Sequence, residues 1–84
     1  MTIFPIIHNN GTSQAQLIRQ ISEANTALDE AIEALCKMSP NARDYYQTGN
    51  YNEAKTAHTL RIQELKNVQN EIMSIGEAIA DQTP

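Results

Sequence analysis

The sequence has few of the residues that usually brace a small protein. Its 84 residues include one cysteine, Cys36, so the chain has no second thiol with which to close a disulfide. A lone cysteine without a nearby pair of histidines also argues against a structural zinc site, and it suits a reducing compartment. A chain this short buries a modest fraction of its surface. We therefore expect one domain that is stabilised by a partner and not by a covalent link.

Long hydrophobic runs and an excess of basic residues are also missing. No apolar run approaches the ~20 residues of a membrane-spanning helix, and the first ten residues lack the basic start and the apolar core of a signal peptide. The net charge of −4 disfavours binding to nucleic-acid polymers and to anionic membranes, because both interactions depend on many cations. We therefore expect a cytoplasmic protein that binds neither.

The few cations are gathered in one part of the chain. Residues 37–66 contain five of the six Lys and Arg residues and three acidic residues, whereas the rest contains Arg19 and seven acidic residues. The middle of the sequence is thus locally basic on an acidic protein. This charge is too small for a polymer of phosphates, but it is enough for one small anion.

The first part of the chain predicts an arm, a turn and a long helix. Pro5 excludes a helix interior, so we expect residues 1–12 to form a short extended N-terminal segment that ends in a turn. A helix is predicted over residues 13–39, because Ser13 begins a capping box and the residue before Pro40 disfavours helical geometry. Its apolar stripe, at intervals of four and three, is Leu17, Ile21, Ala24, Leu28, Ala31, Leu35 and Met38. Three positions seven residues apart widen this stripe on one side: Ile18, Asn25 and Ile32.

A second helix is predicted over residues 52–80, after a connector over residues 40–51 and before a tail over residues 81–84. Its predicted stripe is Ala54, His58, Arg61, Leu65, Val68, Ile72, Ile75 and Ile79. The fold class is therefore all-α: an antiparallel helical hairpin with a short N-terminal arm. A lone hairpin does not cover both stripes, so we expect homo-oligomers, most simply a dimeric four-helix bundle.

Two positions of the second stripe, His58 and Arg61, are polar, and two interpretations of them stay open. In the first, they form a buried network with Asp44 or a tyrosine hydroxyl and fix the register of the helices. In the second, they point into a pocket near the connector, where Arg61 would grip a phosphate or carboxylate.

The connector sequence NARDYYQTGN contains more charged and aromatic side chains than a connection between two helices requires. Its tyrosines, Tyr45 and Tyr46, either pack over the end of the bundle or stack on a planar base while Arg43 pairs with a phosphate. Asp44 would then accept a hydrogen bond from the base or ribose, or orient an arginine.

A second polar cluster, with His8 and Asn10, lies before the first helix. It is either a simple turn or, in an antiparallel association, part of a pocket shared with the connector of another chain. Catalytic constellations are missing from the sequence, so we expect no enzyme, no cofactor and no metal.

Three stretches together resemble a family of small helical proteins encoded by bacteriophages and prophages. The family motifs are I-H-x-N-G-T-S, P-N-G-R-D-Y-Y-P-Q-G and E-H-x-x-R, and their counterparts here are residues 7–13, 40–49 and 57–61. The chain departs from these motifs at Ala42, Gln47 and Ala57, and the backbone of the connector is expected to differ at Ala42, which replaces a glycine. The resemblance implies a phage origin but no particular activity.

By analogy with small oligomeric phage proteins, we expect a non-enzymatic sponge for a nucleotide signal of bacterial defence. The signal would be a cyclic oligonucleotide or a cyclic or conjugated ADP-ribose. The expected ligand contacts are Arg43, Asp44, Tyr45, Tyr46, His58 and Arg61, with His8 and Asn10 from a neighbouring subunit. One rival hypothesis is a helical module that inhibits or scaffolds a host or phage protein. The other is a purely structural bundle.

Overall fold

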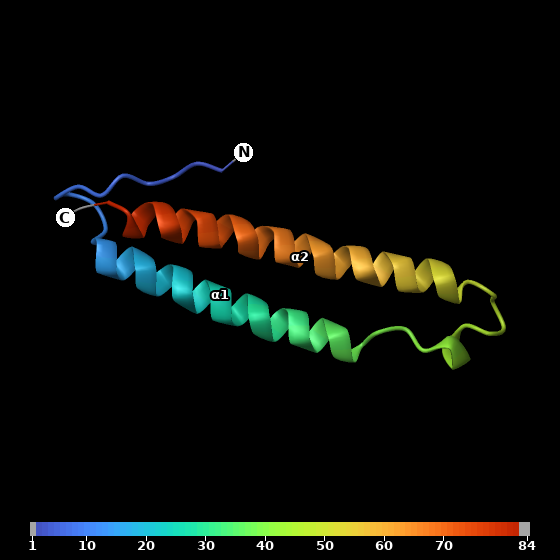
Figure 1. Ribbon diagram of the computed structural model, residues 1–84. Coiled ribbons are helices and arrows are strands. Elements are labelled where there is room, and N and C mark those ends of the chain that lie inside the picture. The colour runs from blue at the N-terminus through green and yellow to red at the C-terminus, as the bar shows by residue number, and fades with distance from the viewer. Residues whose placement is uncertain (1, 83–84) are drawn as a thin grey trace.

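A computed structural model describes residues 2–82 and shows an all-helical chain. Helix α1 spans Gln14–Lys37, a 3₁₀ turn, η1, spans Ala42–Asp44, and helix α2 spans Tyr51–Ala80. The two long helices run antiparallel, side by side, and a connector joins them at one end (Figure 1). This arrangement confirms the predicted all-α hairpin, and the helix ends fall within two residues of the predicted ranges. Residue 1 and residues 83–84 lie outside the described residues.

The ends of α1 follow from local chemistry. The Ser13 hydroxyl accepts a hydrogen bond from the Gln16 amide at 3.2 Å, which closes the predicted N-cap. At the other end, the Ser39 hydroxyl donates to the Cys36 carbonyl at 2.8 Å. Pro40 follows directly, and a proline disfavours helical geometry in the residue before it. The helix therefore ends at Lys37, two residues before the predicted end.

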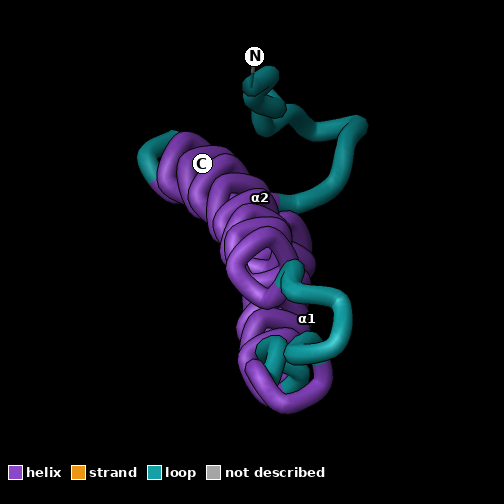
Figure 2. The backbone as a smooth tube through the Cα atoms, turned by 90° about the vertical axis from the view of Figure 1, so that its right-hand side faces the viewer, coloured by secondary structure: helices purple, strands orange, loops and turns teal. Residues whose placement is uncertain are grey.

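The hairpin is long and thin. Its extents are 61 × 22 × 17 Å, and a view almost along the helices shows them in a single layer with the N-terminal arm off to one side (Figure 2). Among residues 2–82 only Ile79 and His58 are buried. A single layer of two helices leaves most of each apolar stripe partly accessible to water, so the chain by itself has almost no core.

Polar side chains set the register of the two helices at three levels. At the open end of the hairpin, the Gln14 amide donates to the carbonyls of Ile79 and Gln82, both at 2.8 Å. In the middle, the Gln69 amide donates to the Asp29 carboxylate at 2.6 Å. The third contact involves His58, near the connector. Because each bond joins residues far apart in sequence, a shift of one helix along the other would break all three.

The seam of α2 differs from its predicted stripe at two positions. Arg61 and Val68 were expected to face α1, but Arg61 is exposed and Val68 is 43% exposed. Ile62 and Gln69 are more buried and take their places, one residue further along. Neighbouring residues on a helix point about 100° apart, and burying an unpaired guanidinium is costly. The helix therefore turns Ile62 towards the seam.

The open end is closed by a clamp between the tail and the arm. The Gln82 side chain accepts from the Ile7 amide at 2.7 Å and donates to the Pro5 carbonyl at 2.9 Å. Residues 2–7 form no helix or strand, and the arm follows the end of α2 (Figure 1). Ile3 and Ile6 are 80% and 74% exposed, so the clamp holds the backbone of the arm while its side chains stay in water.

Candidate ligand-binding site at the connector

The connector begins with a short helical turn built by Asn41. The Asn41 side chain accepts from the Arg43 amide at 3.0 Å, and its carbonyl accepts from the Asp44 amide at 3.0 Å. An asparagine cap of this kind satisfies two amides that have no partner within the turn. Both Arg43 and Asp44 are exposed. The turn therefore carries an exposed arginine and an exposed aspartate on consecutive residues at the connector end of the molecule.

The two adjacent tyrosines have different environments. Tyr45 is half-buried, and its ring lies 6.4 Å from the ring of Tyr51, centroid to centroid, at an angle of 47°. Tyr46 is 76% exposed, and its hydroxyl has a contact with the Gln47 amide at 3.5 Å, the outer limit of a hydrogen bond. Packing at the end of the hairpin is thus performed by Tyr45 and Tyr51. The ring of Tyr46 is free to meet a ligand.

The segment after Tyr46, residues 47–50, is constrained by hydrogen bonds within the connector. The Thr48 hydroxyl is 2.6 Å from the Asn50 side-chain oxygen and 3.2 Å from the Tyr45 carbonyl. Gly49 has a φ of 71°, and its amide donates to the Tyr45 carbonyl at 2.9 Å. Such a φ strongly favours glycine. The connector is therefore an ordered loop that holds Tyr46 outward.

His58 is a structural residue within the chain. It is 5% exposed, and its Nε2 atom lies 2.7 Å from the Leu35 carbonyl in the last turn of α1. A carbonyl only accepts, so Nε2 carries the hydrogen. The Leu35 carbonyl also accepts from the Met38 amide at 3.1 Å, so the imidazole is its second donor and links α2 to the end of α1. The expectation that His58 fixes the register is supported, but the expected partners, Asp44 or a tyrosine hydroxyl, were wrong.

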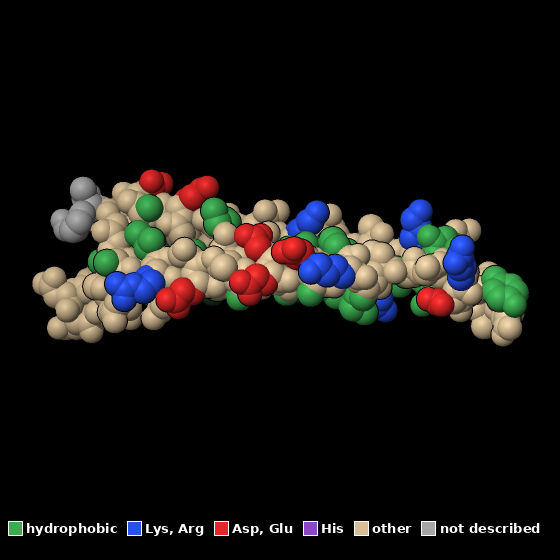
Figure 3. Space-filling view, turned by 90° about the horizontal axis from the view of Figure 1, so that it is seen from below, with side chains coloured by type: hydrophobic (Ala, Val, Ile, Leu, Met, Phe, Trp, Pro, Cys, Tyr) green, Lys and Arg blue, Asp and Glu red, His purple; other side chains and the backbone are tan. Residues whose placement is uncertain are grey.

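Arg61 does not join His58 in the seam. It lies three residues further along α2 and is exposed, so no buried pair forms between these two side chains. The guanidinium adds to the positive charge of the connector half. The space-filling view shows most of the cationic side chains over this half and most of the acidic ones over the half with the open end (Figure 3).

His8 and Asn10 lie at the opposite end of the hairpin from the connector. The Asn10 amide donates to Nδ1 of His8 at 3.3 Å, and the Gly11 amide donates to the His8 carbonyl at 3.2 Å. A Cβ on Gly11 would lie 2.9 Å from the His8 ring, so a glycine lets the ring fold over the turn. In a molecule 61 Å long, one chain does not bring this turn to Arg43. A site that combines them requires a second chain.

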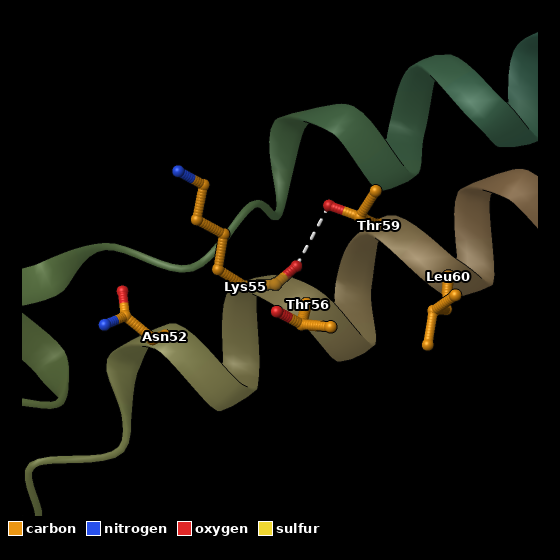
Figure 4. A pocket seen from close by; sticks show the side chains of 5 residues that line it. All are labelled: Asn52, Lys55, Thr56, Thr59 and Leu60. Carbon is orange, nitrogen blue, oxygen red and sulfur yellow. Dashed lines mark hydrogen bonds between the residues drawn. The ribbon is translucent and has the colours of Figure 1, made fainter.

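Two adjacent surface hollows beside the connector were not anticipated from the sequence. One, of about 390 Å³, is lined by Asn52, Lys55, Thr56, Thr59 and Leu60 (Figure 4). The other, of about 410 Å³, shares three of these residues. All the lining side chains come from α2, and the Thr59 hydroxyl is bonded to the Lys55 carbonyl at 3.0 Å. A single helix does not enclose a ligand, so these hollows extend the connector surface without forming a pocket.

A third hollow lies between the two helices near the open end. This apolar groove, of about 310 Å³, is lined chiefly by Ile18, Ile21, Asn25, Met73, Gly76 and Ala80. Gly76 lies close to α1, because a Cβ there would be 3.1 Å from Cγ2 of Ile21. The Asn25 side-chain oxygen is buried and has no hydrogen-bond partner among the described residues.

Residues 2–82 contain neither a metal-binding cluster nor a membrane-spanning helix. No group of three or more His, Cys, Asp or Glu side chains there is placed to hold a metal ion. In the described part of the chain, no helix combines the length and the hydrophobicity needed to cross a membrane. Comparison of the chain with protein-family models, with curated proteins and with solved structures found no match. The function is therefore inferred from the side chains at the connector alone.

Proposed function

We propose that this protein is a phage-encoded, non-enzymatic sponge that binds and sequesters a nucleotide signal of a bacterial anti-phage defence system. The signal is a cyclic oligonucleotide or a cyclic or conjugated ADP-ribose, and the sponge works as a homo-oligomer. In this proposal Arg43 pairs with a phosphate and Tyr46 stacks on a base. Asp44 accepts from a base edge or a ribose hydroxyl.

The exposed ring of Tyr46 carries the proposal. A tyrosine that is 76% exposed adds little to the stability of the chain, because its apolar surface stays in water. The packing role is already filled by Tyr45 against Tyr51. Base stacking on an aromatic ring contributes about 1–3 kcal/mol per base and tolerates any base. A ring held outward by an ordered loop is suited to that interaction.

The electrostatics of the connector support an anionic ligand of limited size. Arg43 lies within the segment that holds five cations and three acidic residues, and its guanidinium offers a planar fork of donors to phosphate. The rest of the chain is acidic and would repel a long polyanion. A small nucleotide that contacts only the tip avoids this repulsion.

The other predicted contacts take supporting roles. Tyr45 holds the loop through Tyr51, and His58 joins the start of α2 to the end of α1. Arg61 is exposed on the same half and contributes positive charge. His8 and Asn10 reach the ligand only from the N-terminal arm of a neighbouring subunit.

The test is thermal unfolding of the purified protein with cyclic dinucleotides, cyclic trinucleotides and ADP-ribose isomers. A ligand at a thousand times its Kd should add about 4 kcal/mol to the free energy of unfolding. Arg43→Ala and Tyr46→Ala should each remove the shift. Arg19→Ala and Val68→Ala are the matched controls, since they truncate an exposed arginine and an exposed apolar side chain away from the connector. Intact ligand recovered after heating supports a sponge, and degraded ligand would indicate an enzyme.

The exposed arm favours one alternative function, a module that binds a host or phage protein. Ile3 and Ile6 present apolar side chains to water, which is unusual for two neighbouring large aliphatic residues. If no ligand of the panel shifts the unfolding temperature, a pull-down from host lysate tests this alternative. Loss of the captured protein with Ile3→Ser and Ile6→Ser, but not with Tyr46→Ala, would favour it.

A further inference from the structure

We infer that the apolar groove is a self-association surface, and that a second copy of this chain occupies it in antiparallel orientation. The Asn25 side chains of the two copies then face each other across a two-fold axis. This inference goes beyond the proposed function and does not depend on it.

The chain exposes more surface than a compact monomer of its mass, which indicates that a large face forms an interface. The chain exposes 6558 Å². A compact monomer of its mass would expose about 5,000 Å². The excess of roughly 1,500 Å² is the area per copy that an obligate homodimer interface typically buries.

The groove has the composition of an interface core. Ile18 and Met73 line it and are 40% and 45% exposed in the single chain, so a partner would bury apolar surface there. Its one orphan polar atom is the side-chain oxygen of Asn25, which is already shielded from water. A shielded acceptor without a donor is destabilising. The oxygen is enclosed by the chain itself, so a partner's N–H reaches it once the Asn25 side chain rotates towards the groove.

A second copy supplies that donor through symmetry. When two α1 helices pair about Asn25, the amide N–H of each asparagine can donate to the side-chain oxygen of the other. A single asparagine at a seam is a known device for fixing register and oligomeric state. Such an interface is isologous, so one set of residues satisfies both copies.

The residues around Asn25 complement themselves in antiparallel pairing. Ile18 and Ile32 lie seven residues before and after Asn25. In antiparallel register Ile18 therefore meets the partner's Ile32, and Ile32 meets the partner's Ile18. Asn25 is also close to the middle of α1, Gln14–Lys37, so the two helices overlap over their whole length.

Charge selects antiparallel over parallel pairing. A parallel dimer would place two acidic open ends together and two basic connector halves together. An antiparallel dimer places the basic half of each copy beside the acidic half of the other (Figure 3). Complementary potentials of this kind favour one orientation and suppress the other.

Antiparallel pairing also has a consequence for the connector. It brings the connector of one copy to the end at which the other copy carries His8 and Asn10. This consequence rests on the proposed function, because it completes the nucleotide site from two subunits. The experiments below use no nucleotide, so failure of the dimer and failure of ligand binding are separate outcomes.

Sedimentation equilibrium of the full chain tests the surface. The expected mass is twice 9.4 kDa. Ile18→Lys should shift the mass to that of a monomer while circular dichroism still reports helix. Val68→Lys is the control, since Val68 is equally exposed, at 43% against 40%, and does not line the groove. A monomeric wild-type protein at every concentration, or an Ile18→Lys variant that stays dimeric, would overturn the inference.

Cysteine cross-linking tests the orientation and does not depend on the folding of Ile18→Lys. In a Cys36→Ser background, Ile18→Cys and Ile32→Cys are oxidised separately and as a mixture. Antiparallel pairing predicts a disulfide-linked dimer in the mixture and little in either variant alone. Cross-linking of each variant alone would indicate parallel pairing, and no cross-link in any sample would place the interface elsewhere; both results contradict the inference.

Discussion

At the scale of single residues, two side chains are buried in the hairpin formed by residues 2–82. Ile79 is fully buried, and His58 is the one buried polar residue among residues 2–82. His58 replaces an apolar residue in the seam, and its ring donates to the Leu35 carbonyl at 2.7 Å. Removal of that donor breaks this bond between α2 and α1, while the Leu35 carbonyl keeps the Met38 amide, at a cost of about 0.5–1.5 kcal/mol. His58→Leu should therefore lower the free energy of unfolding by this amount, as measured by urea denaturation, although it adds apolar surface.

A conservative control separates the hydrogen bond from the shape of the side chain. His58→Gln retains an N–H donor of similar reach and should recover part of the loss. If His58→Leu is instead as stable as the wild type, the bond to Leu35 contributes nothing and His58 acts only by filling space. Ile79→Ala, which removes the largest buried group, should cost about 2–5 kcal/mol in the same assay.

At the scale of elements, the open end depends on two glutamines that join separate segments. Gln14 connects the start of α1 to the carbonyls at the end of α2, and Gln82 connects that end to the arm. Gln14→Ala should loosen the last turn of α2, because the carbonyls of Ile79 and Gln82 each lose a hydrogen bond from α1, although the Ile79 carbonyl keeps the Gln82 amide. We expect amides near Ile79 to exchange with solvent at least tenfold faster, as measured by hydrogen exchange.

The effect of Gln14→Ala should be confined to the open end. Amides near His58, at the far end of α2, should keep their rates, and Gln20→Ala on the exposed side of α1 should change neither set. Equal acceleration along the whole of α2 would mean that the hairpin opens as one unit, and that the polar contacts do not stabilise separate levels.

At the scale of the whole molecule, Asn25 is inferred to set the orientation of the two copies in the dimer, and not to strengthen their association. Asn25→Leu removes the orphan oxygen and adds apolar surface to the groove, so association should strengthen by about tenfold or more. The orientation should become less exclusive at the same time. In the cysteine assay, Ile18→Cys alone should then cross-link, whereas with Asn25 in place it should not. An Asn25→Leu variant that dissociates would contradict the symmetric pairing of the amides.

Local signals in the sequence were sufficient to predict where the two helices begin and end. The capping serine, Pro40 and the spacing of apolar residues at four and three placed both helices within two residues of their ends. Each of these signals acts over a single turn, so it needs no knowledge of the partner helix. The short 3₁₀ turn within the connector was left open, since its one strong local signal is the side chain of Asn41.

The candidate site was less predictable than the fold. The sequence singled out Arg43, Asp44 and both tyrosines, and the structure places all four at one tip. It did not distinguish Tyr45, which packs, from Tyr46, which is exposed, because adjacent identical residues carry the same local signal. The hollows on α2 and the groove were missed as well, since each depends on side chains that converge only after folding.

The sequence by itself determined two amphipathic helices, a polar connector and the uneven distribution of charge, because these properties follow from the residues and their spacing. Only the tertiary structure decided that Ile62 and not Arg61 faces α1, that the partner of His58 is a backbone carbonyl, and that Asn25 is shielded without a donor. Neighbouring residues on a helix differ by about 100° in direction. A periodic pattern does not decide which of two neighbouring residues faces the other helix. The packing of the two helices decides it.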